Sequence, residues 1–278
     1  MRNCLAGICC FVSVCAASSE LMVLSVMPVE LWQSQNSAYL PVAMVQQILN
    51  HYPSPYTIES VSLNRAFAEL QSRSGACVMG VRKTTERQQN FLFSQPYVIA
   101  PEIRLVVKAD SDSDWAARLK VMQDQDGLVS LQRVLDARTP PVLVTEDGRS
   151  YGAAIDPILS KHRRNSPIYV KTAKVSNFGD TLPMLNKGFV DMALEYPVAI
   201  TDLEFPMLAS FRLKEADPFA LAYFACNRDA VTAELLQQLD SAILQFRNQP
   251  EFKQMLLAIY PPAERAKIWQ AWLRLSGS

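Results

Sequence analysis

Residues 148–152 (GRSYG) have the spacing of the nucleophile elbow of serine hydrolases, and they lie between a predicted strand and a predicted helix. A nucleophilic serine needs a histidine within hydrogen-bond reach. The only histidine after Ser150 is His162, and twelve residues along one helix separate the two by roughly 18 Å. The pattern therefore disfavours a serine hydrolase, which we keep only as a third hypothesis, and we assign no catalytic residue.

The same turn has a second interpretation, as a binding site for an anion. Ser150, at the predicted start of a helix, would lie where backbone N–H groups and the positive end of the helix dipole attract a carboxylate or a phosphate. Its neighbours Arg149 and Tyr151 would line such a site. A plain helix-capping role for Ser150 remains an open alternative.

Residues 80–87 (GVRKTTER) hold a second group of chemically competent side chains, directly after a predicted strand. Thr84 or Thr85 is placed to cap a short helix that carries Arg87. A guanidinium such as that of Arg87 or Arg82 binds a ligand carboxylate through two parallel hydrogen bonds. On pattern alone, however, a run of cations is more often a solvated surface, and this alternative stays open.

Composition excludes several classes of function. The chain has 278 residues, 49% hydrophobic and 19% charged, which predicts two domains or one large one with a sizeable core. Lys and Arg (27) balance Asp and Glu (27), so nucleic acid is not an expected partner. The sequence contains two histidines and no HExxH, CxxC or P-loop motif. We therefore expect no metal and no cofactor.

The N-terminus predicts export. Arg2 precedes an apolar stretch over residues 5–17 that ends in small residues, as in a secretory signal peptide, which we place at residues 1–18. The stretch is too short for a spanning helix, so no membrane insertion is expected after cleavage; an uncleaved anchor is the alternative. Only Cys77 and Cys226 remain in the exported chain, either as a disulfide or as two buried thiols.

Strands alternate with helices along the exported chain, which predicts βαβ units, an α/β fold and largely parallel sheets. Strands are expected at residues 21–26, 56–61, 76–81, 102–108, 141–145, 168–171, 191–194 and 220–226. Helices are expected at residues 40–49, 64–72, 150–161, 180–187, 231–246, 251–259 and, as an amphipathic segment with Trp269 and Trp272, 263–275.

Residues 77–107 (CVMGVRKTTERQQNFLFSQPYVIAPEIRLVV) resemble the family-3 extracellular solute-binding proteins, the polar-amino-acid binders of bacterial ABC importers. In that family a strand is followed by Gly-x-Ser/Thr-Ile-Thr-Pro-Glu-Arg and then by Phe-Ser-x-Pro-Tyr. The positions that match without gaps are Gly80, Thr84, Glu86, Arg87 and Phe93–Tyr97. Residues 148–152, 190–194 and 234–260 also resemble family stretches, so the similarity spans most of the exported chain.

The resemblance implies a two-lobed Venus-flytrap fold (type II periplasmic binding protein) that binds its ligand in a cleft between the lobes and closes about a hinge. Lobe one would comprise residues 19–109 and 219–278, and lobe two residues 110–218, with crossings near 108–114 and 213–219. Cys77 and Cys226 would lie on neighbouring strands of lobe one, which favours their disulfide. The protein would be a periplasmic monomer without enzymatic activity, and its partners would be an ABC permease or a sensor.

Departures from the family pattern suggest a particular ligand. Arg82 stands where the family has a ligand-binding Ser or Thr, and Tyr196, beside Glu195, stands where the family has an Asp that binds the ligand's ammonium group. Arg87, the carboxylate clamp, is retained. We therefore expect an anionic ligand, such as a dicarboxylate or an acidic conjugate. The predicted ligand-binding residues are Arg87, Arg82, Gly80, Trp32, Arg149, Ser150, Tyr151 and Tyr196.

A second hypothesis from another class is a degenerate relative that works as an interaction or sensory module without transport. The altered cleft motivates it, as does the C-terminal segment, which extends past the usual end of the family. In this hypothesis Trp269 and Trp272 are exposed and contact a partner.

Overall fold

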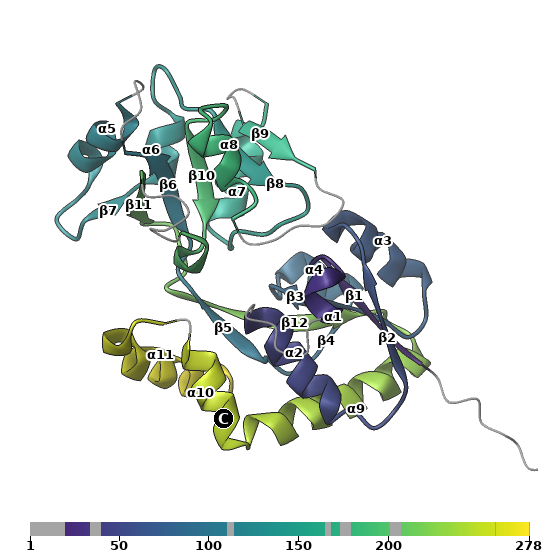
Figure 1. Cartoon of the computed structure of the whole chain (residues 1–278). Coiled ribbons are helices and arrows are strands. Elements are labelled where there is room, and N and C mark those ends of the chain that lie inside the picture. Colours follow the sequence, from purple (N-terminus) through teal and green to yellow (C-terminus); the bar gives the residue numbers. More distant parts are fainter. Residues whose placement is uncertain are drawn as a thin grey trace, which may run out of the picture.

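The computed structural model has two lobes joined by crossing strands, and each lobe contains one six-stranded sheet flanked by helices (Figure 1). It describes residues 20–33, 40–109, 114–164, 168–172, 179–200, 207–258 and 260–277. The predicted signal peptide and residues 110–113 of the predicted first crossing lie outside the described residues. The two-lobed α/β fold is the one that the sequence predicted.

Lobe one is built on a sheet with the strand order β2-β1-β3-β12-β4, to which β5 adds beside β12. Its strands are β1 (Leu21–Ser25), β2 (Tyr56–Ser60), β3 (Ala76–Val81), β4 (Leu92–Phe93), β5 (Val98–Pro101) and β12 (Phe219–Cys226). Its helices are α1 (Glu30–Gln33), α2 (Leu40–Asn50), α3 (Leu63–Ser72), α4 (Thr85–Asn90), α9 (Ala230–Arg247), α10 (Pro250–Ala258) and α11 (Pro262–Leu275).

Lobe two is built on a sheet with the strand order β7-β11-β6-β10-β8-β9. Its strands are β6 (Arg104–Lys108), β7 (Leu128–Val129), β8 (Leu143–Glu146), β9 (Ile168–Lys171), β10 (Met192–Glu195) and β11 (Leu208–Leu213). Its helices are α5 (Trp115–Met122), α6 (Leu131–Leu135), α7 (Ile155–His162), α8 (Leu182–Asn186) and the 3-10 helix η1 (Pro197–Ala199). The sequence did not predict α5, β5 or β11.

The chain passes from one lobe to the other between β5 and β6 and again between β11 and β12. The first crossing is earlier than the predicted position near residues 108–114, because β6 hydrogen-bonds to β10 and β11 of lobe two. Strands β6 and β12, which each follow a crossing, run antiparallel to their sheet neighbours. The sheets are therefore mixed, and less parallel than the sequence suggested.

The core of lobe one joins sequence segments that the insertion of lobe two separates. Strand β1 is buried on both faces, and α9 packs on the sheet through a stripe of apolar residues that recurs every three or four positions, from Leu235 to Phe246. Cys77 of β3 and Cys226 of β12 face each other, are fully buried and form a disulfide. This bond is the one that the family resemblance implied.

Helix α11 belongs to this core. The side chain of Trp272 is 1% exposed and packs against Phe252 of α10, with ring centroids 5.2 Å apart. Trp269 is partly buried beneath the ammonium group of Lys253. The expectation of two exposed tryptophans was wrong, because the apolar stripe of α11 covers lobe one. Among the described helices, none combines the length and the apolar character that crossing a membrane requires.

Candidate ligand-binding cleft

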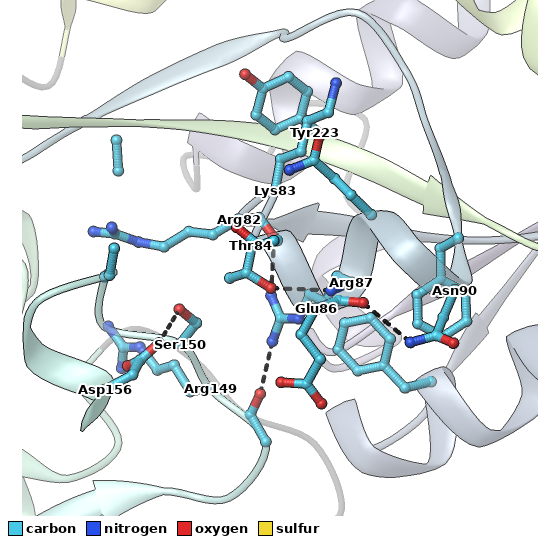
Figure 2. A pocket seen from close by; sticks show the side chains of 18 of the residues that line it. Arg82, Lys83, Thr84, Glu86, Arg87, Asn90, Arg149, Ser150, Asp156 and Tyr223 are labelled. Atoms are coloured by element: carbon cyan, nitrogen blue, oxygen red, sulfur yellow. Dashed lines mark hydrogen bonds between the residues drawn. The ribbon is translucent and has the colours of Figure 1, made fainter. Parts of the chain in front are cut away.

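A cleft of about 1160 Å³ lies between the lobes. Its lobe-one wall comes from the end of β3, from α3 and from α4, and its lobe-two wall comes from the turn after β8 and from α7. Of the eight predicted ligand-binding residues, four line it: Arg82, Arg87, Arg149 and Ser150. Figure 2 shows these four side chains, with dashed lines for the hydrogen bonds of Arg87 with Thr84 and of Ser150 with Asp156.

Helix α4 places Arg87 at the cleft. The chain leaves β3 at Val81, and Thr84 then caps α4, because its side-chain oxygen accepts a hydrogen bond of 3.2 Å from the backbone N–H of Arg87. This is the capped short helix that the sequence predicted. Arg87 therefore stands in the first turn, and its side chain points toward the turn after β8 (Figure 2).

The guanidinium of Arg87 bonds to backbone carbonyls on both sides of the cleft. Its Nη1 donates to the carbonyl oxygen of Arg82 (3.1 Å) and its Nη2 to that of Gly148 in lobe two (2.9 Å). The group also lies 4.5 Å from the ring centroid of Phe67. Burial lowers the pKa of Arg87, although arginine remains charged at any physiological pH. No ion pair to Arg87 occurs among the described residues, so its charge is available to a ligand carboxylate.

Arg82 crosses the inner part of the cleft. Its Nη1 lies 2.9 Å from Oδ2 of Asp217, which is in the second crossing, and its Nη2 lies 3.3 Å from the hydroxyl of Tyr196 in lobe two. One arginine of lobe one is thus bonded both to the hinge region and to lobe two.

Arg149 is held by carboxylates within lobe two. Its Nη1 lies 3.3 Å from Glu195 and 3.2 Å from Glu146, and its guanidinium lies about 5 Å from the rings of Tyr151 and Tyr196. Burial lowers the pKa of Arg149, but Glu195 and Glu146 together raise it above its ordinary value. Burial also raises the pKa of Glu195, against the opposing effect of Arg149. The charge of Arg149 is therefore compensated inside the protein.

Ser150 does not begin a helix. Its hydroxyl donates a hydrogen bond of 2.5 Å to Oδ2 of Asp156, and the next backbone N–H donates to Oδ1 of the same carboxylate (2.7 Å). Helix α7 begins only at Ile155, because Gly152 takes a φ of 122° that continues the turn. The predicted helix-terminus anion site at Ser150 was wrong, since Asp156 already occupies the position of the anion.

His162 has no part in the cleft. It contacts Gln132 (3.0 Å) and Asp136 (3.2 Å) of the α6 region, and the hydroxyl of Ser150 is bonded to Asp156. The Ser–His pair that a serine hydrolase needs is therefore not formed.

The other four predicted residues lie outside the cleft lining. They are Gly80, Trp32, Tyr151 and Tyr196. Trp32 donates its indole N–H to Ser25 (3.0 Å) and packs on the lobe-one core. Tyr151 is buried beneath Arg149, and Tyr196 bonds to Arg82, which lines the cleft.

Several cleft residues were missed by sequence reasoning. Asn64, at the start of α3, donates a hydrogen bond to Asp147 across the cleft. Asp156 and Asp217 provide carboxylates on the lobe-two and hinge sides. In the sequence these residues differ from others only in being polar and close to the end of a predicted helix or strand. Many surface residues share both properties.

The cleft carries about as many carboxylates as cations. The cations are Arg82, Lys83, Arg87, Arg149 and Arg163, and the carboxylates are Glu86, Asp147, Asp156 and Asp217. Glu146 and Glu195 add negative charge behind Arg149. The expectation of an anionic ligand is therefore not supported. It was based on the positive charges of the arginines and did not include the carboxylates that pair with them. Among the described residues, no group of three His, Cys, Asp or Glu side chains could hold a metal ion.

Comparison with solved structures supports the fold. An ancestral arginine-binding protein bound to arginine superposes with a TM-score of 0.62 at 15% identity, over 87% of this chain and 98% of that one. ArtJ of Geobacillus stearothermophilus, which binds arginine, lysine and histidine, gives 0.60 at 15% identity, over 90% and 100%. A putative L-cystine ABC transporter protein of Listeria monocytogenes gives 0.62 at 16% identity, over 86% and 94%.

Comparison of sequences identifies the family. No curated protein sequence matches the chain significantly. The sequence profile of the bacterial extracellular solute-binding proteins, family 3, matches residues 40–257, from the start of α2 to near the end of α10. The chain therefore belongs to family 3 of the bacterial extracellular solute-binding proteins.

Proposed function

We propose that the protein captures a small carboxylate-bearing solute between its lobes, and that Arg87 binds the carboxylate. The observation that carries this proposal is the environment of the Arg87 guanidinium, which faces the cleft and whose hydrogen bonds to described residues all go to neutral carbonyl oxygens. A carboxylate is a stronger acceptor than a carbonyl oxygen for a cationic donor. A solute carboxylate can therefore replace the carbonyl of Gly148 as a partner of Arg87.

The balance of charges in the cleft favours a zwitterion over a dianion. Asp156 accepts two hydrogen bonds but forms no ion pair among the described residues, and Asp147 contacts the neutral amide of Asn64. Both carboxylates are available to a cationic group of the solute. Two of the similar structures named above bind arginine, or arginine, lysine and histidine, and the third is named for the transport of L-cystine; all of these amino acids carry a carboxylate and an amino group. We infer that the solute belongs to the amino-acid class.

The cellular role that fits this site is delivery of the solute to an ABC permease, or to a sensor, in the periplasm. The predicted signal peptide supports export of the chain. The buried disulfide between Cys77 and Cys226 also supports it, because such bonds persist in oxidising compartments. The alternative of an interaction module has lost one of its two motivations, the exposed C-terminal tryptophans, since Trp272 is buried in lobe one.

A thermal-shift screen of amino acids and dicarboxylates tests the proposal, because a solute that binds only the folded state raises the unfolding temperature. Hits are then measured by isothermal titration with wild-type protein and with Arg87→Ala. We expect at least one amino acid to bind the wild type and to lose most of its affinity in the variant. A hit that binds both proteins equally would remove Arg87 from the site, and a preference for dicarboxylates would restore the anionic ligand.

A further inference from the structure

Arg82 occupies the inner end of the cleft with its own cationic group. It follows β3 directly, and its side chain extends away from Arg87 toward lobe two (Figure 2). The side chain is only 14% exposed, although it lines the cleft. Its Nε is buried and has no hydrogen-bond partner within the described part of the chain. The guanidinium is therefore enclosed by other parts of the protein.

Three elements enclose this guanidinium. Asp217 supplies a carboxylate oxygen 2.9 Å from Nη1, and Tyr196 supplies a hydroxyl 3.3 Å from Nη2. Gly152 leaves room beside them, because a Cβ at that position would lie 3.0 Å from Nη1 and 2.8 Å from Oδ2 of Asp217. We call Asp217, Tyr196 and Gly152 the guanidinium seat. A planar cation with several N–H donors needs hydrogen-bond acceptors in its plane and open space beside it. The carboxylate and the hydroxyl are such acceptors, and the glycine, which has no side chain, leaves the space.

We propose that Arg82 is a specificity-determining residue, which fills the guanidinium seat as a tethered occupant and confines the solute to the outer cleft beside Arg87 and Asp156. A free cation must compete with a group that is attached next to the seat and therefore has a high effective concentration. The consequence for the natural solute rests on the proposed function above. The existence of the seat does not, and it can be tested alone.

The ion pair itself contributes little to stability. The carboxylate of Asp217 is 47% exposed, and ion pairs with a solvated partner are weak. Removal of the Arg82 guanidinium should therefore leave the fold intact and the seat empty.

The test uses the full exported chain and the small probe methylguanidinium, with methylammonium at equal ionic strength as the control cation. Arg82→Ala empties the seat, and Arg82→Gln is a second variant that retains a polar side chain. Lys83→Ala is the matched control, because it removes the neighbouring cation, which lies over Phe93 and Tyr223 instead of in the seat. The double variant Arg82→Ala/Asp217→Asn removes the carboxylate of the seat.

We expect methylguanidinium to bind Arg82→Ala saturably and about tenfold or more tightly than it binds the wild type or Lys83→Ala, as for one charge-assisted hydrogen bond. Methylammonium should bind less, and Asp217→Asn should abolish the gain. Equal binding to all variants, or no preference for methylguanidinium, would overturn the proposal. If the wild type bound no solute in the metabolite screen while Arg82→Ala bound the probe, the proposed function would fail and the seat would stand.

Discussion

Arg87 of lobe one and Gly148 of lobe two are joined across the cleft by a hydrogen bond of 2.9 Å, from Nη2 to the carbonyl oxygen. The bond couples the group proposed to bind the solute to the relative position of the lobes. A solute whose carboxylate displaces this carbonyl must bond to lobe two through another of its groups if the cleft is to remain closed. Asp156, which lies in the same cleft wall, is the nearest candidate to bind a cationic group of that solute.

Arg87→Lys should lower the affinity for the solute found in the screen by about 10- to 100-fold. Lysine keeps the charge but loses the planar fork that bonds to two acceptors at once. Isothermal titration measures the effect. Arg65→Ala is the control, because that side chain is 61% exposed and pairs with Glu59 and Glu69 on the surface, away from the cleft lining. Unchanged affinity in Arg87→Lys would show that Arg87 contributes only a diffuse positive charge.

Asn64→Ala should shift the protein toward an open form. The amide of Asn64 bonds to Asp147 on the opposite wall, and loss of a contact between the walls favours states in which the lobes are farther apart. We expect a larger radius of gyration by small-angle X-ray scattering and a modest loss of solute affinity. Asn90→Ala is the matched control, since the side chain of Asn90 bonds to the carbonyl oxygen of Glu86 within α4 and makes no bond across the cleft to a described residue. Identical scattering from Asn64→Ala and the wild type would contradict this coupling.

Local chemistry explains what the sequence predicted well. The cap of α4 depends on Thr84 and on a backbone N–H three residues later, so a short stretch of sequence suffices to predict it. The start of α7 was misplaced because the turn depends on the φ of Gly152 and on Asp156, whose carboxylate binds Ser150 from six residues away. A polar residue within a helical stretch carries no sign of such a bond.

Long-range pairing explains what the sequence could not show. Arg149 is neutralised by Glu195, 46 residues later, and Arg82 by Asp217, 135 residues later. Counting cations in a motif therefore overestimates the positive charge of the cleft. The first crossing was predicted too late in the sequence for a similar reason. Strand β6 is assigned to lobe two by its pairing with β10 and β11, which lie far along the chain.

Gly152→Ala should destabilise the protein more than Gly188→Ala. Both glycines have positive φ, 122° and 73°, so both variants bear backbone strain. A Cβ at Gly188 meets nothing within 4 Å, whereas one at Gly152 meets Asp217 and Arg82 at 3.0 Å or less. Urea unfolding measures the difference, which isolates the contact from the strain. Equal destabilisation of the two variants would show that Asp217 and Arg82 move away from the added methyl group with no loss of free energy of unfolding.

Trp272→Ala should lower the free energy of unfolding by about 3–5 kcal/mol, as expected for removal of a fully buried aromatic side chain. The ring packs between Phe252 and the guanidinium of Arg247 in the lobe-one core. Leu275→Ala on the same helix is the control, because that residue is 44% exposed. A Trp272→Ala variant as stable as the control would mean that α11 is not part of the cooperative unit of lobe one.

Cys77→Ala/Cys226→Ala should destabilise the protein by about 5 kcal/mol at most, the value that loop entropy gives for a sequence separation of 149 between the two cysteines. The loop that the bond closes includes both crossings and all of lobe two, so the bond ties together the two sequence segments that form lobe one. Without it, the unfolded chain gains the freedom to separate those segments, and refolding must bring them together again. Each single variant should lose nearly as much stability as the double variant, because either substitution breaks the same bond.

Guanidinium chloride unfolding under non-reducing conditions measures all three variants. Reduced wild-type protein is a fourth sample, and its stability should match that of the double variant. A double variant as stable as the oxidised wild type would show that pairing of β3 with β12 alone holds lobe one together.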